Sequence, residues 1–253
     1  MITKAAVLHE MHLQRPYNKS NPLKIEEVEL DSPGFNEVVV KVKAAGICHS
    51  DLSVINGNRP RPLPMVLGHE AAGIVIELGK GVKELKVGDH VVFAFLPSCG
   101  DCDYCQTGRA ALCKPGAEAN RKGTLLGGYQ RISKDAKPYY HHLGVSGFAE
   151  HSVASVDSLV KIENDIPFEI AALFGCAVMT GVGAVVNTGQ LKFGDSILVV
   201  GLGGVGLSAI IGAKAAGATK IIGADLNPEK RKAAKLLGAH HVIDSSKKGS
   251  HEE

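Results

Sequence analysis

The pattern of apolar residues changes near residue 165, and this change limits the possible folds more than any other feature of the 253-residue chain. Before it, short runs rich in β-branched residues have the length of strands and are separated by turn-forming segments. These runs are Lys4–His9, Leu23–Leu30, Val38–Ala44, Gly73–Leu78, His90–Ala94 and Gly147–Ala154. Residues 97–130 have the composition of a loop. The pattern predicts an antiparallel barrel or sandwich for this part of the chain.

After the change, buried strands alternate with helices. Ile170–Val186 is apolar, rich in small residues and longer than a strand, which predicts a helix. Further strands and helices are then expected in the order Ile197–Val200, Val205–Ala216, Ile221–Ala224, Pro228–Leu237 and His241–Ile243. This βαβαβ order predicts a parallel sheet, and it fits one of the two halves of a doubly wound dinucleotide fold. The polar segment from Asp244 to Glu253 predicts a frayed end.

The composition narrows the range of functions. The formal net charge is +2, so no excess of charge points to nucleic acid or to an anionic membrane. Apolar residues make up 45% and charged residues 21%, which is typical of a globular protein. The N-terminal residues lack the apolar core of a signal peptide, and no apolar run reaches about 18 residues, so no membrane-spanning helix is expected. Six cysteines without a leader favour reduced thiols in the cytoplasm over disulfides.

Four of the six cysteines follow the spacing C-x₂-C-x₂-C-x₇-C. They are Cys99, Cys102, Cys105 and Cys113. Four thiolates this close predict a closed tetrahedral zinc site, which would stabilise a loop that has little apolar content. Three alternatives remain open: four unligated thiols, an iron–sulfur cluster, and a zinc ribbon that binds nucleic acid.

The other two cysteines, Cys48 and Cys176, lie far apart in the sequence with His69 between them. Two thiolates and one imidazole would leave a fourth zinc position open, as catalysis by zinc requires. Each residue taken alone is more often structural, because a lone cysteine in an apolar segment packs as a small hydrophobe. The spacing does not establish that the three residues converge.

A glycine-rich loop, residues 201–206, follows one predicted strand and opens a helix. In this context its backbone N–H groups and the helix N-terminus favour binding of a pyrophosphate, although a glycine-rich turn without a ligand is the alternative. Asp225 ends the next strand, where a carboxylate accepts ribose hydroxyls and disfavours a 2′-phosphate, so the sequence predicts NAD. Lys230 could add a ribose or phosphate contact, or it is a solvated helix lysine.

These motifs resemble those of zinc-containing alcohol dehydrogenases of the medium-chain dehydrogenase superfamily. The resemblance rests on the segment Gly68-His69-Glu70 with Gly73, Gly79 and Val82, on the four-cysteine cluster, on residues 175–181 (GCAVMTG) and on residues 201–206 (GLGGVG). The motifs occur in family order and extend over essentially the whole chain. Residues 137–150 also resemble the branch related to glutathione-dependent formaldehyde dehydrogenases and aryl-alcohol dehydrogenases.

The resemblance implies two Zn²⁺ per chain and NAD as the cofactor. It implies Cys48, His69 and Cys176 as ligands of a catalytic zinc, and Cys99, Cys102, Cys105 and Cys113 as ligands of a structural zinc. It implies that the coenzyme is bound by His49, Gly201, Gly203, Gly204, Val205, Gly206, Asp225 and Lys230.

Further roles come from the same resemblance. Ser50 matches the hydroxyl that takes the alcohol proton, and Asp51 matches the carboxylate that orients the imidazole ligand. Glu70 matches a carboxylate behind the zinc, and Phe95 matches an apolar wall of the substrate pocket. One position departs from the family, because Ser53 stands where many members have a histidine that relays the proton.

The resemblance implies a GroES-like β-barrel catalytic domain over residues 1–176, with the structural-zinc loop at residues 97–115. The N-terminal half of a Rossmann domain, with about three parallel strands, is expected over residues 177–253. The implied function is NAD- and zinc-dependent, reversible oxidation of primary alkyl or aryl alcohols in the cytoplasm. The expected partners are small alcohols or aldehydes, with no nucleic acid and no membrane, and the full-length family implies a homo-oligomer. A truncated zinc-binding fragment without activity and a zinc-free relative such as a quinone reductase are the alternatives.

Overall fold

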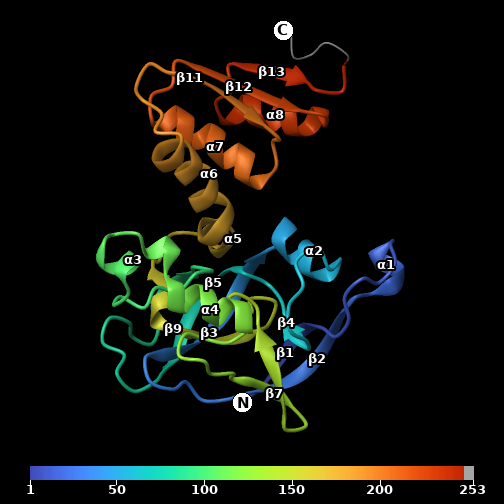
Figure 1. The fold of residues 1–253 in the computed structure, drawn as a ribbon, viewed down its shortest axis with the longest axis vertical. Coiled ribbons are helices and arrows are strands. Elements are labelled where there is room, and N and C mark those ends of the chain that lie inside the picture. The colour runs from blue at the N-terminus through green and yellow to red at the C-terminus, as the bar shows by residue number, and fades with distance from the viewer. Residues whose placement is uncertain (248–253) are drawn as a thin grey trace. The chain divides into compact units, whose positions relative to one another are not determined.

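The computed structural model describes residues 1–247, and residues 248–253 lie outside this description. The chain divides into two compact units, Met1–Gly175 and Cys176–Glu253. Figure 1 follows the chain through both units by colour. Each unit is described here by itself.

The first unit contains a closed barrel of five strands in the order β1-β2-β7-β8-β4. Their bounds are Ile2–Leu8 (β1), Leu23–Leu30 (β2), Met65–Val66 (β4), Ile132–Lys134 (β7) and Lys137–His141 (β8). The neighbours pair antiparallel except β4 and β8, which run parallel. The two-residue strand β4 closes the barrel by pairing with both β1 and β8. The barrel predicted from the sequence for this part of the chain is therefore confirmed.

A second sheet in this unit has the strand order β10-β6-β5-β3-β9. The bounds are Glu37–Gly46 (β3), Glu70–Leu78 (β5), His90–Phe93 (β6), His151–Ser155 (β9) and Leu159–Lys161 (β10). The central strand β3 shifts its register against β5 at two points, which is typical of β-bulges. Apolar residues of β3, β5 and β6 form a core that includes Val38, Val75 and Phe93.

Short helices decorate the first unit. They are α1 (Tyr17–Ser20), α2 (His49–Ile55), α3 (Asp103–Gln106), η1 (Ala110–Leu112), α4 (Lys114–Lys122), η2 (Val156–Ser158) and α5 (Phe168–Leu173). The expectation that residues 97–130 are all loop was wrong for α3, η1 and α4. Helix α4 is polar overall, its buried face consists of Gly116, Ala119 and Asn120 without a large apolar side chain, and its ends are well marked. The Cys113 side chain accepts the Gly116 N–H at the start, and Gly123 with φ +70° ends the helix.

The second unit is a three-stranded parallel sheet with helices. Its elements are η3 (Phe174–Val178), which overlaps the division, then α6 (Met179–Gly183), η4 (Ala184–Thr188), β11 (Ser196–Val200), α7 (Gly204–Ala215), β12 (Lys220–Asp225), α8 (Pro228–Leu237) and β13 (His241–Asp244). Figure 1 shows α7 and α8 on the same face of the sheet. Side chains from that face, including Ile210, Ile221 and Ala234, form the core of the unit. The predicted βαβαβ order and the three parallel strands are confirmed.

The long apolar helix expected over Ile170–Val186 occurs, but it is not a regular α-helix. Residues 174–178 and 184–188 have π-helical hydrogen bonding. Among the described residues, Phe168–Thr188 is one stretch that is long and apolar enough to cross a membrane by length and composition, a test that core helices also pass. Ala171 and Ala172, near its start, are buried in a small core with Ala72 of β5, whereas Ile170 and Phe174 are exposed.

The start of the expected frayed end is ordered. Asp244 is the last residue of β13, and its carboxylate accepts hydrogen bonds from Arg231 and Ser246. The prediction of fraying from Asp244 was therefore wrong at its first residue, and the part of it on residues 248–253 falls outside the described residues.

Candidate metal centres and coenzyme site

The pairing of β3 with β5 brings the candidate catalytic metal ligands together. Gly46 at the end of β3 lies opposite Glu70 at the start of β5. A Cβ atom on Gly46 would lie 2.3 Å from Oε2 of Glu70, so glycine at this position leaves room for the buried Glu70 side chain. Cys48 follows the strand end as the N-cap of α2, in a capping box with Asp51.

The buried carboxylate of Asp51 connects the surrounding groups. Its Oδ1 accepts hydrogen bonds from Nδ1 of His69 at 3.0 Å and from the Gly68 N–H at 3.2 Å. Its Oδ2 accepts the Cys48 N–H at 3.1 Å, and Nδ1 of His142 lies 3.2 Å from Oδ1. Burial alone would raise the pKa of Asp51, but the contacts with His142 and His69 outweigh it and hold that pKa well below its usual range. Asp51 is therefore a fixed negative charge.

His69 is oriented by this carboxylate. Burial alone would lower the pKa of His69, but Asp51 and the Cys48 side chain outweigh it and raise that pKa to about 9 in the metal-free protein. Because Nδ1 donates to Asp51, the opposite atom Nε2 is left as the ligand nitrogen. This Nε2 is buried and has no hydrogen-bond partner among the described residues, which fits an atom reserved for a metal.

Cys48, His69 and Glu70 each offer one donor atom, and these atoms lie within 4.8 Å of one another. Cys176 is joined to Gly175 by one peptide bond, and a Cβ atom on Gly175 would lie 2.0 Å from a carbonyl oxygen of β6. The packing of the first unit thus fixes the backbone next to Cys176, the further cysteine that the resemblance implies as a zinc ligand. Two thiols and an imidazole are ligands that suit zinc.

The four-cysteine cluster forms a second donor group. The sulfur atoms of Cys99, Cys102, Cys105 and Cys113 lie within 4.8 Å of one another. Backbone N–H groups point at the sulfurs: the Cys99 N–H donates to Cys113 Sγ at 3.3 Å, and the Cys102 N–H donates to Cys99 Sγ at 3.4 Å. Backbone hydrogen bonds from Cys105 and Lys114 lower the pKa of the Cys102 thiol to about 6. In the metal-free protein, burial raises the pKa of the neighbouring Cys105 thiol to about 12. Four sulfur atoms this close to one another fit a tetrahedral metal.

The residues that the resemblance assigns to proton transfer (Ser50) and to contact with the coenzyme (His49) lie on α2. His49 is exposed and Ser50 is half-buried. Ser53, at the position where many family members have a relay histidine, donates its hydroxyl hydrogen to the backbone oxygen of His49 at 3.0 Å. The Ser53 side chain is thus engaged within its own helix.

Phe95 lies next to the imidazole ligand. Its ring centroid is 6.1 Å from that of His69 in an edge-on arrangement. The Phe95 carbonyl oxygen accepts a hydrogen bond from Nδ2 of Asn120 at 2.7 Å, and Asn120 belongs to α4, which follows the cysteine cluster. This contact fixes the backbone of the predicted pocket wall.

The glycine loop has the geometry of a tight strand-to-helix turn. Gly201 has φ +89°, and a Cβ atom on Gly206 would lie 1.9 Å from the Gly201 carbonyl oxygen. Gly203 is the N-cap of α7 and has open space within 4 Å of its Cβ position. Gly204 begins the helix and Val205 is 40% exposed. The helix N-terminus is therefore accessible, as binding of a pyrophosphate requires.

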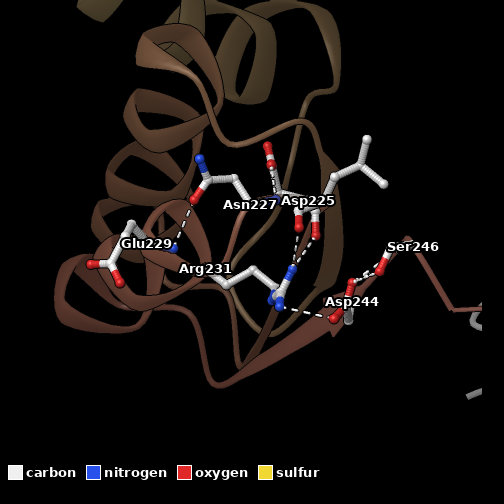
Figure 2. Close-up of polar contacts among 7 residues, drawn as sticks. Asp225, Asn227, Glu229, Arg231, Asp244 and Ser246 are labelled. Atoms are coloured by element: carbon white, nitrogen blue, oxygen red, sulfur yellow. Dashed lines mark hydrogen bonds and ion pairs between the residues drawn. The ribbon is translucent and has the colours of Figure 1, made fainter.

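Asp225 ends β12 beside this loop. Its Oδ2 accepts the Leu202 N–H at 2.7 Å. Its Oδ1 accepts the Asn227 N–H at 2.8 Å (Figure 2). These backbone hydrogen bonds, from Asn227 and then Leu202, lower the pKa of the carboxyl group. Lys230 is exposed on α8 and its charge also favours the ionised carboxylate.

Sequence reasoning missed three residues at these sites. His142, next to Asp51, directly follows His141, and nothing in the local sequence distinguishes the two histidines. Arg231 and Asp244 form an ion pair of 2.9 Å beside Asp225. The sequence did hold a signal for Asp244. Two neighbouring parallel strands each end in an aspartate, which predicts that the two carboxylates lie close together.

Comparison with known proteins agrees with the geometry. Residues 34–164 match the family described as "Alcohol dehydrogenase GroES-like domain", and residues 204–253 match "Zinc-binding dehydrogenase". The chain is 42% identical over 224 residues to S-(hydroxymethyl)glutathione dehydrogenase of Escherichia coli O1:K1 / APEC, and the match covers 88% of this chain and 61% of that protein.

Two solved structures are also similar. The structure described as "Alcohol dehydrogenase zinc-binding domain protein" from Burkholderia ambifaria aligns with a TM-score of 0.91 and 36% identity. The alignment covers 100% of this chain and 66% of that one. Benzyl alcohol dehydrogenase from Acinetobacter calcoaceticus aligns with a TM-score of 0.88 and 35% identity, over 98% and 65%. The chain thus spans less than two thirds of the length of these relatives. With both family matches on the same chain, it belongs to the zinc-containing alcohol dehydrogenases of the medium-chain superfamily.

Proposed function

We propose that this chain carries the zinc and NAD machinery for the reversible oxidation of primary alcohols to aldehydes. The buried Asp51–His69 hydrogen bond supports this proposal most directly, because it leaves Nε2 of His69 unpartnered beside the Cys48 thiol. In this proposal Cys48, His69 and Cys176 hold the catalytic zinc, and the four-cysteine cluster holds a structural zinc. Glu70 lies in the same donor group and would ease the exchange of ligands.

When bound, zinc supplies a Lewis acid for the alcohol oxygen and NAD supplies the hydride acceptor. The side chains of the protein orient the zinc ligands and exclude water from the site. Asp51 keeps the proton of His69 on Nδ1 and so fixes the direction of the ring. Ser50, which is half-buried, accepts the alcohol proton at its hydroxyl oxygen and passes its own proton to solvent water. Phe95 supplies an apolar wall that excludes water.

The coenzyme is proposed to lie at the glycine loop. Its pyrophosphate would be bound by N–H groups of Gly203, Gly204 and Val205 at the start of α7, with His49 as a further contact. Gly201 and Gly206 shape the turn. Asp225 would accept the ribose hydroxyls, with Lys230 beside it.

The substrate class is proposed to be primary alkyl or aryl alcohols. Support comes from the apolar ring of Phe95 and from the names of two relatives, a benzyl alcohol dehydrogenase and an S-(hydroxymethyl)glutathione dehydrogenase. A cytoplasmic location and a homo-oligomeric assembly remain predictions from the reduced cysteines and from the family.

A second candidate function is a zinc-binding portion of such an enzyme without activity of its own. The fact that the chain spans 61% of the first curated relative favours it. Zinc content and NADH formation at 340 nm, with ethanol and then benzyl alcohol, separate the candidates. NADH formation that is lost in His69→Ala supports the enzyme. Two zinc ions per chain with no NADH formation supports the zinc-binding portion, and no zinc would contradict both and favour a zinc-free relative.

A further inference from the structure

The parallel strands β12 and β13 both end in an aspartate. Asp225 and Asp244 are partners in the register of the two strands, so their carboxylates lie at the same corner of the sheet. This corner is also where Asp225 is proposed to bind the adenosine ribose. Figure 2 shows Arg231 of α8 reaching from the helix to this corner.

The guanidinium of Arg231 is occupied by groups of the fold. Its Nη1 donates to the carbonyl oxygen of Asp225 at 2.7 Å and to that of Leu226 at 2.9 Å. Its Nη2 donates to Oδ2 of Asp244 at 2.9 Å, and the side chain is only 15% exposed. Arg231 is thus held against the turn after β12 and the end of β13.

Asp244 is itself held in place. Its Oδ1 accepts the Ser246 N–H at 3.1 Å and the Ser246 hydroxyl at 2.6 Å, as Figure 2 shows. The corner therefore contains two carboxylates, Asp225 and Asp244, and one guanidinium, and the charges of Lys230 and Lys247 also act on these carboxylates. The ionised carboxylate of Asp225 itself disfavours a phosphate group on the ribose.

Dinucleotide sites that accept a 2′-phosphate use an arginine near this turn. Arg231 is the single arginine in residues 176–253, and its position six residues after Asp225 suits that role. We propose that Asp244 is a coenzyme-specificity determinant: by holding Arg231 at the end of β13, it keeps the guanidinium from a 2′-phosphate. This inference rests on the proposed binding of NAD and adds a second acidic residue to Asp225.

The test uses the full chain and two adenosine fragments that isolate this corner. The dissociation constants of 5′-AMP and adenosine 2′,5′-bisphosphate are measured by isothermal titration calorimetry. We expect the wild type to bind 5′-AMP at least about tenfold more tightly than the bisphosphate. Asp244→Asn keeps the size and removes the charge that holds Arg231, so we expect the ratio of the two constants to shift about tenfold towards the bisphosphate, the size of one charge-assisted hydrogen bond.

Two further variants identify the cause of the shift. Adding Arg231→Gln to Asp244→Asn removes the released guanidinium, so the wild-type ratio should return. Glu229→Gln is the matched control, because it removes one carboxylate from the same turn while Figure 2 shows that side chain pointing away from Arg231. An equal shift in Glu229→Gln and Asp244→Asn would show a simple effect of net charge and would overturn the proposal.

The failure of this inference is distinct from failure of the proposed function. Tight 5′-AMP binding with the same ratio in wild type and Asp244→Asn overturns the inference alone. Absence of 5′-AMP binding by the wild type contradicts the proposed coenzyme site and this inference with it. If Asp244→Asn does not fold by circular dichroism, Ser246→Ala loosens Asp244 instead, and a smaller shift in the same direction is expected; no shift overturns the proposal.

Discussion

A single buried carboxylate organises the candidate metal site at the scale of residues. Asp51 accepts hydrogen bonds from one imidazole and from two backbone N–H groups, those of Cys48 and Gly68. It therefore fixes both the ring of His69 and the backbone that presents the Cys48 thiol. A neutral amide at this position could not accept all of these bonds and balance a metal cation.

Replacing this carboxylate should weaken the metal site. We expect Asp51→Asn to lower the zinc affinity of the Cys48–His69 site by about 10- to 100-fold, the usual effect of removing a carboxylate behind a histidine ligand. Competition with a chromogenic chelator measures the affinity. Asp89→Asn is the matched control, since Asp89 is also a buried aspartate that accepts a backbone N–H and pairs with a lysine. Equal zinc retention in Asp51→Asn and wild type would contradict the role of Asp51.

His141 is a fully buried histidine that belongs to neither candidate metal site. Its Nε2 accepts the Arg131 N–H at 3.1 Å. Burial, and then the charge of Arg131, lower the pKa of His141 from 6.5 to about 3. The unfolded chain therefore takes up a proton at this residue as the pH falls through 6.5, and the folded chain does not until about 3.

This difference makes the protein less stable towards acid. Below pH 6.5 the unfolded state binds more protons than the folded state. The free energy of unfolding therefore decreases as the pH is lowered, by at most about 1.4 kcal/mol per pH unit for one group. We expect His141→Gln to show a shallower fall between pH 6.5 and 4.5 in urea denaturation. An unchanged slope in His141→Gln would count against this account.

At the scale of elements, the turn between β11 and α7 depends on close backbone approach. A side chain on Gly206 would collide with the Gly201 carbonyl oxygen, whereas a side chain on Gly203 has open space. We expect Gly206→Ala to destabilise the second unit by about 1–3 kcal/mol, the usual cost of overpacking. Gly203→Ala should leave stability nearly unchanged and weaken NADH binding. Thermal unfolding and NADH titration measure the two effects, and equal stability of both variants would refute the steric argument.

The sequence predicted elements whose pattern is local. The strands β11 to β13 and the helices between them follow from short apolar runs, an Asn227 cap and Gly238. Helix α4 was missed because its ends, and not an apolar stripe, define it. Local sequence patterns could not predict how the barrel closes, because Met65 and Val66 pair with residues 140–141, which are far away in the sequence. His142 was missed for the same reason: only that long-range pairing brings the end of β8 towards Asp51.

At the scale of the whole molecule, the two units have separate cores. The barrel core contains residues such as Val7, Val28 and Leu125, and the core of the second unit is built from residues 185–242. Over residues 176–247 the second unit has three strands, with Leu198 55% and Val200 74% exposed on β11. These exposed apolar side chains remove little surface from water, so they add little to the stability of the second unit.

We therefore expect the second unit to unfold first. Hydrogen exchange measured by mass spectrometry along a temperature series should show protection lost in β11–β13 before it is lost in β1, β2 and β5. Ligands should act on different transitions, because each stabilises the part that binds it. Saturating NADH should raise the midpoint of the first transition. Cys99→Ser, which removes a ligand from the four-cysteine cluster that lies wholly in the first unit, should lower the midpoint of the second, with exchange increasing first around Cys99–Cys113. A single transition that moves as a whole with both treatments would contradict independent units and would require that the two cores unfold together.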